Sequence, residues 1–217
     1  MLVAAVALVD AEGIQALTMR RLAADLGVEA MSLYYHLPGK EALLDGLVES
    51  VIDQIDAAVS HLDATAIEGD WRTRLRQRFL AAREVMLRHP WAPGLIVSRP
   101  TIPVGVYAYY DGIVGTLVGT GFSYRIAHRA LHAFGSLPFG FAQEIFTPAS
   151  AGGSLEVDVA EAEFAAMAEA LPHLTAMVAN EIHDVADATL GWCDSQVEFE
   201  FTLDLLLDGL ERLRGQA

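Results

Sequence analysis

Apolar residues recur at intervals of three and four along most of the chain, which is the period of an amphipathic α-helix. The longest such stripe covers residues 40–62, and a second runs from Trp71 to Met86 and stops at His89. The same period predicts further helices over residues 103–119, 123–146, 158–170, 172–189 and 194–214. No segment alternates with a sustained period of two, so the sequence predicts an all-α fold.

The first forty residues form shorter segments that glycines separate. They predict helices over residues 4–12, 18–26 and 29–36, divided by Gly13 and Gly27. Two short helices joined by a tight glycine-containing turn form a helix-turn-helix, whose second helix enters the DNA major groove in DNA-binding proteins. A plain helical hairpin inside a bundle has the same spacing, so the spacing alone leaves both interpretations open.

The pattern also sorts the residues of this segment into two faces. Its apolar residues are expected to form a buried seam between the helices: Leu22, Ala23, Leu26, Val28 and Leu33. The remaining residues are expected to face outward: Thr18, Arg20, Arg21, Ala30, Met31, Ser32, Tyr35, His36 and Lys40.

The run GIQALTMRRLAADLGVEAMSLYYHLPGKEALLDGL resembles the DNA-binding signature of the tetracycline-repressor (TetR) family. LTMRRLAADLGV is similar to the second helix and turn of the family, and SLYYHLPGKEALL to its recognition helix and the start of helix four. The resemblance implies a three-helix DNA-binding domain over residues 1–45 and a connecting helix over about 38–62. It implies DNA contacts by Thr18, Arg20, Arg21, Ala30, Met31, Ser32, Tyr34, Tyr35, His36 and Lys40.

These contacts divide by chemistry. Arg20, Arg21 and Lys40 carry the fixed positive charges that neutralise phosphates. Ala30 and Met31 have no hydrogen-bonding side chain, so they can recognise a thymine methyl group but cannot pair with guanine or adenine. For Tyr34, whose ring could equally lie in the seam, both positions remain open.

Three later segments resemble the effector-binding domain of tetracycline-repressor-like proteins: WRTRLRQRFLAAREVMLRHPW, SRP at 98–100 and EFEFTLDLLLDGLERL. The resemblance implies a helical domain over residues 63–217 that binds a small molecule and dimerises through a four-helix bundle. Residues 123–146 and 194–214 would supply that bundle. The second of these is apolar on more than one face, which is typical of a helix that meets a partner.

The tetracycline–magnesium site of the family is only partly represented. Leu95 and Asp56 occupy the positions of two of its histidines, while Glu144 falls on a nearby carboxylate. A different effector is therefore expected, with no cofactor. The candidate ligand-binding residues are Phe79, Met86, Trp91, Tyr107, Tyr110, His128, His132, Phe134, Phe139 and Glu144. An ordinary aromatic core accounts for the aromatic members equally well.

His128 and His132 lie four residues apart, a spacing at which two imidazoles can share a metal ion. With Glu144 they define the alternative function, an all-α metal-binding enzyme or ligand carrier. Core, pocket or interface histidines are the commoner case, so no metal is expected.

Amino-acid composition excludes further classes of protein. The 217-residue chain has 53% hydrophobic residues and a single cysteine, which excludes disorder and a disulfide scaffold. Its net charge of −15 divides into −8 over residues 1–69, +5 over 70–149 and −12 over 150–217. The arginines of residues 72–83 are expected to form a solvated face.

The expected protein is cytoplasmic, without a membrane span. It is a homodimeric repressor, not an enzyme, and binds a palindromic double-stranded DNA operator from which a small molecule releases it.

Overall fold

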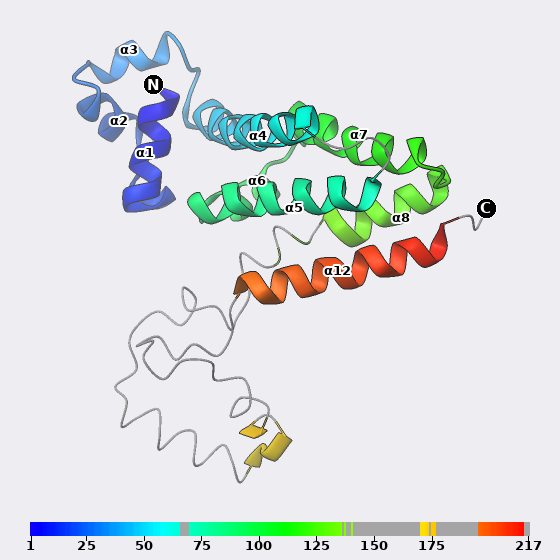
Figure 1. Cartoon of the computed structure of the whole chain (residues 1–217). Helices are drawn as coiled ribbons and strands as arrows, with labels where there is room; N and C mark the ends of the chain where they lie inside the picture. Colours follow the sequence, from blue (N-terminus) through cyan, green and yellow to red (C-terminus); the bar gives the residue numbers. More distant parts are fainter. Residues whose placement is uncertain are drawn as a thin grey trace. The chain divides into compact units, whose positions relative to one another are not determined.

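The computed structural model describes residues 1–65, 70–135, 137, 140, 170–173, 175–176 and 195–214. The described residues form helices and contain no strand, as the sequence predicts (Figure 1). The helices are α1 (Leu2–Glu12), α2 (Met19–Asp25), α3 (Ala30–Tyr34), α4 (Lys40–Thr65), α5 (Trp71–Arg88), α6 (Ala92–Ser98), α7 (Val104–Gly119), α8 (Tyr124–Gly135) and α12 (Ser195–Leu213). Among the described helices, none has the length and apolar character needed to cross a membrane.

Helices α1, α2 and α3, which we call the head, begin and end within two residues of the predicted boundaries. Gly13 ends α1 with a positive φ of 80°, and Gly27 follows α2 with a φ of 67°. These are conformations that glycine adopts without steric cost. The Thr18 hydroxyl accepts a hydrogen bond of 3.1 Å from the backbone N–H of Arg21, which caps the start of α2.

The seam between α2 and α3 is mostly as predicted. Leu22, Ala23 and Leu33 are buried, and Leu26 is half-buried. The prediction is wrong for Val28, whose side chain is 44% exposed. This residue lies inside the tight turn, where its N–H donates to the carbonyl of Ala23, and the turn leaves its side chain at the surface.

Helix α4 connects the head with the helices that follow it, because it contacts α1, α5, α6 and α7. It lies beside α5 (Figure 1). Its predicted apolar stripe is buried at Leu43, Leu47, Val48, Val51, Ile52, Ile55 and Val59. One face of one helix therefore supplies the core for both the head and the helices that follow.

The arginines of α5 do not all form the solvated face that the sequence predicts. Arg78 is only 8% exposed and Arg83 only 2%. The Arg78 guanidinium donates to the backbone carbonyl of Tyr109 (3.2 Å) and lies 5.5 Å from the centre of that tyrosine's ring. A Cβ at Gly112 would lie 2.3 Å from Arg78 Nη1, so the glycine makes room for this buried cation.

The helices after α5 agree only in part with the segments that the apolar pattern predicts. Helices α7, α8 and α12 coincide with predicted segments, whereas α6 was not predicted. The predicted helix over 158–170 lies outside the described residues except for its last residue. Most of the segments 136–146 and 172–189 lie outside them too. The last turns of α12 are joined to α5, since Trp71 Nε1 donates to Glu211 (3.0 Å) and Arg72 pairs with Asp208.

Asp70 caps the start of α5, and its contribution to stability can be measured. Its carboxylate accepts hydrogen bonds from the backbone N–H and the hydroxyl of Thr73, which hold the pKa of Asp70 below its ordinary value. Asp70→Ala should lower the free energy of unfolding by about 1 kcal/mol at pH 7, measured by urea denaturation.

The lowered pKa fixes the pH dependence of this effect. The stabilisation should be complete above the ordinary aspartate pKa of about 3.9 and be lost as the pH falls through the lowered folded value. Asp70→Asn is the control, because asparagine also caps helices and does not titrate. An asparagine variant as unstable as the alanine variant would contradict this account of the cap.

Candidate DNA-binding and effector-binding sites

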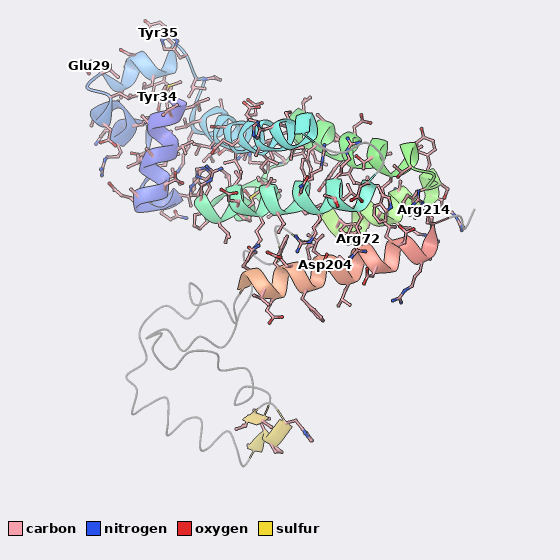
Figure 2. All side chains as sticks on the ribbon, in the orientation of Figure 1. Glu29, Tyr34, Tyr35, Arg72, Asp204 and Arg214 are labelled. Atoms are coloured by element: carbon pink, nitrogen blue, oxygen red, sulfur yellow. The ribbon has the colours of Figure 1, made fainter. Side chains whose placement is uncertain are left out.

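The predicted DNA-binding residues lie on the surface of the head and at the start of α4. Tyr35 is 88% exposed, Met31 69% and Tyr34 46%, so Tyr34 is not buried in the seam. Figure 2 shows both tyrosines on the head. Ala30 is half-buried, and the other predicted residues are exposed: Thr18, Arg20, Arg21, Ser32, His36 and Lys40. The short α3 thus presents apolar, hydroxyl and aromatic groups to solvent.

Carboxylates reduce the positive charge of this surface in two ways. Arg21 forms ion pairs with Glu12 (2.6 Å) and Asp25 (3.1 Å), so two carboxylates of the head already neutralise its guanidinium. Glu29, which precedes α3 and is labelled in Figure 2, adds an exposed carboxylate that the sequence analysis did not include. Its position directly before the predicted recognition helix is the sequence signal that could have placed Glu29 on this surface. Arg20 and Lys40, by contrast, are exposed, and the ion pairs given for the described residues do not include them.

A small cavity of about 20 Å³ lies among α4, α5, α7 and α8. Its lining is Ile52, Ile55, Phe79, Ala82, Met86, Val106, Tyr109, Tyr110 and Gly135. Phe79 stacks on Phe134, with ring centres 5.0 Å apart and an angle of 14° between the rings. A space of this size holds one or two water molecules, whereas pockets for drug-sized ligands measure about 300 Å³ or more.

The structure brings only some of the predicted ligand-binding residues to this cavity. Phe79, Met86 and Tyr110 line it, and Phe134 stacks behind Phe79. Tyr107 is 58% exposed, and its side chain does not line the cavity. Phe139 and Glu144 lie outside the described residues.

Trp91 takes part in a different arrangement, which joins α1 to the segment after α5. Its Nε1 donates to Asp10 (2.6 Å), and the same carboxylate oxygen lies 2.8 Å from Nδ1 of His89. The other nitrogen of that buried imidazole lies 3.1 Å from Oε1 of Gln54 in α4. The ring of His89 therefore bridges the head and the connecting helix.

A second polar link fixes the start of α4. Arg99, which follows α6, donates from Nε to Asp45 (2.8 Å) and from Nη1 to Glu41 (2.9 Å). The side chain of Arg99 is only 6% exposed, whereas those of Glu41 and Asp45 are 77% and 51% exposed. The first turns of the connecting helix are thus attached to the end of α6.

The sequence analysis missed a polar cluster beside the cavity, formed by Asp56, Arg78 and Tyr109. Burial raises the pKa of Asp56, and the nearby Arg78 opposes that shift. Burial also raises the pKa of the Tyr109 hydroxyl well above its ordinary value. The three residues come from three helices, so no spacing within one helix could have grouped them.

His128 and His132 are exposed on α8, with ring centres 4.7 Å apart. Within the described part of the chain, no group of three or more His, Cys, Asp or Glu side chains is arranged to hold a metal ion. The two histidines therefore have no third protein ligand among the described residues.

Comparison with known proteins identifies both parts of the chain. The family model of bacterial regulatory proteins of the tetR family matches residues 1–47, and that of the tetracyclin repressor-like C-terminal domain matches residues 65–214. A possible TetR family transcriptional regulator from Streptomyces coelicolor A3(2) has a crystal structure with a TM-score of 0.77. It is 30% identical, and the match covers 98% of each chain. The actinorhodin complex of ActR from Streptomyces coelicolor shares the fold, at 23% identity over 99% of this chain and 96% of that one, with a TM-score of 0.72.

Curated relatives match over shorter stretches. The HTH-type transcriptional repressor DrrR1 of Streptomyces coeruleorubidus is 39% identical over 99 residues, which is 46% of this chain and 35% of the relative. The tetracycline repressor protein class C of Escherichia coli is 32% identical over 138 residues, 63% of this chain and 60% of the relative. The matches thus span between about a third and three fifths of these two relatives. Together, the two family models and the full-length structural match show that the chain belongs to the TetR family of bacterial regulatory proteins.

Proposed function

We propose that the protein is a homodimeric transcriptional repressor that a small molecule releases from a palindromic operator, and that it does not act as an enzyme. Its DNA-binding domain would cover residues 1–45, with a connecting helix over about 38–62 and an effector-binding domain over 63–217. The exposed face of α3, held at a fixed angle by the Gly27 turn and the buried Leu22 and Leu33, is the observation that carries the proposal.

DNA recognition would follow from the side chains on that face. With α3 in the major groove, Met31 and Ala30 would contact thymine methyl groups, since neither side chain can hydrogen-bond to a base. Ser32 and Tyr35 would donate hydroxyl hydrogens to phosphates or base edges. Arg20 and Lys40 would pair with phosphates on either side of the helix.

Effector response would act through α4. The cavity of about 20 Å³ is too small for an effector, so binding has to move the walls that Ile52 and Ile55 of α4 contribute. The same helix carries Asp45, which Arg99 binds, and Gln54, which faces His89. An effector that binds better to the opened arrangement would shift the protein toward it and reorient the head.

Dimerisation is supported by one face of α12. Three apolar side chains four residues apart are exposed: Val197 at 58%, Phe201 at 59% and Leu205 at 55%. Phe199, Leu203, Leu207 and Leu210 lie on another face and are buried. A second copy of the chain is the occupant that closed two-fold symmetry favours for such a face. Ile126 and Phe134 of α8 are buried within the subunit, and most of residues 136–146, the rest of the predicted bundle segment, lies outside the described residues.

To test the proposal, the purified full chain is first used to select the sequences that it binds from a random pool of double-stranded DNA. A palindromic consensus bound with nanomolar affinity is the expected result. Screening small molecules for release of that DNA then tests the effector response. Recovery of no sequence preference would contradict the proposed function.

The sparse cations of the head predict a shallow salt dependence. If Arg20 and Lys40 of each subunit each neutralise one phosphate, the slope of log K against log salt concentration should be about −4 for the dimer. Arg20→Ala and Lys40→Ala should each flatten the slope by about 2 without changing the preferred sequence, as measured by fluorescence anisotropy. Arg88→Ala, at the end of α5, is the control. An unchanged slope in both head variants would place the phosphate contacts elsewhere.

The exposed face of α12 predicts how the dimer can be broken. Phe201→Glu and Leu205→Glu should each yield monomers in sedimentation equilibrium and should weaken operator binding at least 100-fold, because one half-site alone holds the head weakly. Val97→Glu introduces the same charge at an apolar residue that is 70% exposed on α6 and should leave the dimer intact. Monomers of the α12 variants that keep full operator affinity would refute the model.

The effector should bind without magnesium, because the two histidine positions of the family's metal site hold Leu95 and Asp56 here. A molecule that raises the melting temperature of the protein should raise it equally with and without a chelator. Thermal-shift measurements check this directly. Loss of the stabilisation in the presence of chelator would show that a metal takes part.

A further inference from the structure

The residue that precedes α3 is acidic. Glu29 comes directly before Ala30, the first residue of α3, and its backbone carbonyl accepts a hydrogen bond of 2.9 Å from the N–H of Ser32. Figure 2 labels Glu29 at one end of α3 and Tyr35 at the other. In helix-turn-helix proteins, the N-terminal residues of the recognition helix contact the base edges. Glu29 therefore lies at the end of α3 that would meet the bases.

The carboxylate of Glu29 is available for a contact outside the chain. A residue that precedes a helix can accept a hydrogen bond from the first turn with its side chain, yet the side chain of Glu29 accepts none. It is exposed, and within the described part of the chain its carboxylate has no ion pair or hydrogen bond. Glu12 and Asp25 of the same head differ in this respect, because both pair with Arg21.

A carboxylate on the recognition surface restricts which bases can face it. It only accepts hydrogen bonds, and the donors in the major groove are the N4 amino group of cytosine and the N6 amino group of adenine. Guanine presents the acceptors N7 and O6 there, and thymine presents O4, so a carboxylate facing either base would lose its water without gaining a partner. Adenine is a poorer partner than cytosine, because its N7 acceptor lies beside the N6 donor. Cytosine is thus the base that the carboxylate favours.

The side chains that follow Glu29 make its contribution more important. Ala30 and Met31 come next in the chain, and the side chain of Met31 is 69% exposed. Neither of them can form a hydrogen bond to a base, so neither can compensate for an unsuitable base in front of Glu29. Of these three residues at the start of the recognition surface, Glu29 alone can read the hydrogen-bonding pattern of a base pair.

We propose that Glu29 determines the specificity of the DNA-binding domain by accepting a hydrogen bond from the N4 amino group of a cytosine in each half-site. Because it requires α3 to lie in the major groove of an operator, this role of Glu29 rests on the proposed function. The carboxylate then acts largely by exclusion, since it weakens binding to every sequence that offers it no donor.

The test uses the operator that the full chain selects from random DNA, with each base pair of the half-site replaced in turn. One C·G pair should be found whose replacement in both half-sites raises the Kd of the unmodified protein about 100-fold, or about tenfold for each half-site. Glu29→Ala should bind the original operator and this replaced operator within about threefold of each other and should keep its other base preferences. Fluorescence anisotropy measures each Kd.

A modified base tests the atom that Glu29 is expected to contact. N4-methylcytosine still pairs with guanine, but it presents a methyl group to the major groove where cytosine presents its free N–H. At the identified cytosine, this base should weaken binding of the unmodified protein and leave binding of Glu29→Ala unchanged, because alanine needs no donor there. An equal loss of affinity in both proteins would overturn the proposed hydrogen bond.

Glu49→Ala is the matched control, because it removes an exposed carboxylate from α4 and leaves the surface of α3 unchanged. Its base preferences should equal those of the unmodified protein, and loss of the cytosine preference in this variant would overturn the assignment to Glu29. A Glu29→Ala variant that binds all the operators more tightly by one common factor would show that Glu29 only repels phosphates. That result would also overturn its role in reading a base.

The selection separates this role from the proposed function. A palindromic operator in which no C·G pair depends on Glu29 would refute the role of Glu29 and leave the repressor function standing. Recovery of no preferred sequence by the unmodified protein would refute the proposed function, and base reading by Glu29 with it.

Discussion

The packing of a single helix face determines the rest of this architecture. The stripe from Leu43 to Val59 on α4 is buried against α1 of the head and against α5, α6 and α7. A helix of 26 residues is about 39 Å long, and its backbone hydrogen bonds make it stiff. The same helix therefore contacts both the head and α5, α6 and α7.

The polar contacts around α4 complement this apolar stripe. Arg99 holds the first turns of the helix, and His89 connects its middle to Asp10 of the head. Such contacts are directional, so they permit few orientations, whereas apolar contacts tolerate small slides. The cavity borders α4 at Ile52 and Ile55. The fold thus combines a deformable interior with defined attachment points, which is what a protein with two arrangements requires.

Local signals explain what the sequence predicted well. Thr18 and Gly27 determine the boundaries of α2 through a hydrogen bond and a backbone conformation that involve only close neighbours in sequence. The stripe of α4 likewise needs only the helical period. The burial of Arg78 could not be predicted in this way, because its partner Tyr109 comes from another helix and periodicity counts arginine as polar. The seven-residue α6 is too short for a period to stand out, and the cavity lining comes from four helices.

The sparse charge of the head has a consequence for how the protein locates its site. Non-operator DNA attracts proteins through phosphate neutralisation alone, and here Arg21 is already paired with Glu12 and Asp25. Residence on non-operator DNA should accordingly be brief, with little one-dimensional sliding. The search would then consist mainly of repeated collisions from free solution. Few molecules would be sequestered along the chromosome, so a small number of copies would suffice to keep one operator occupied.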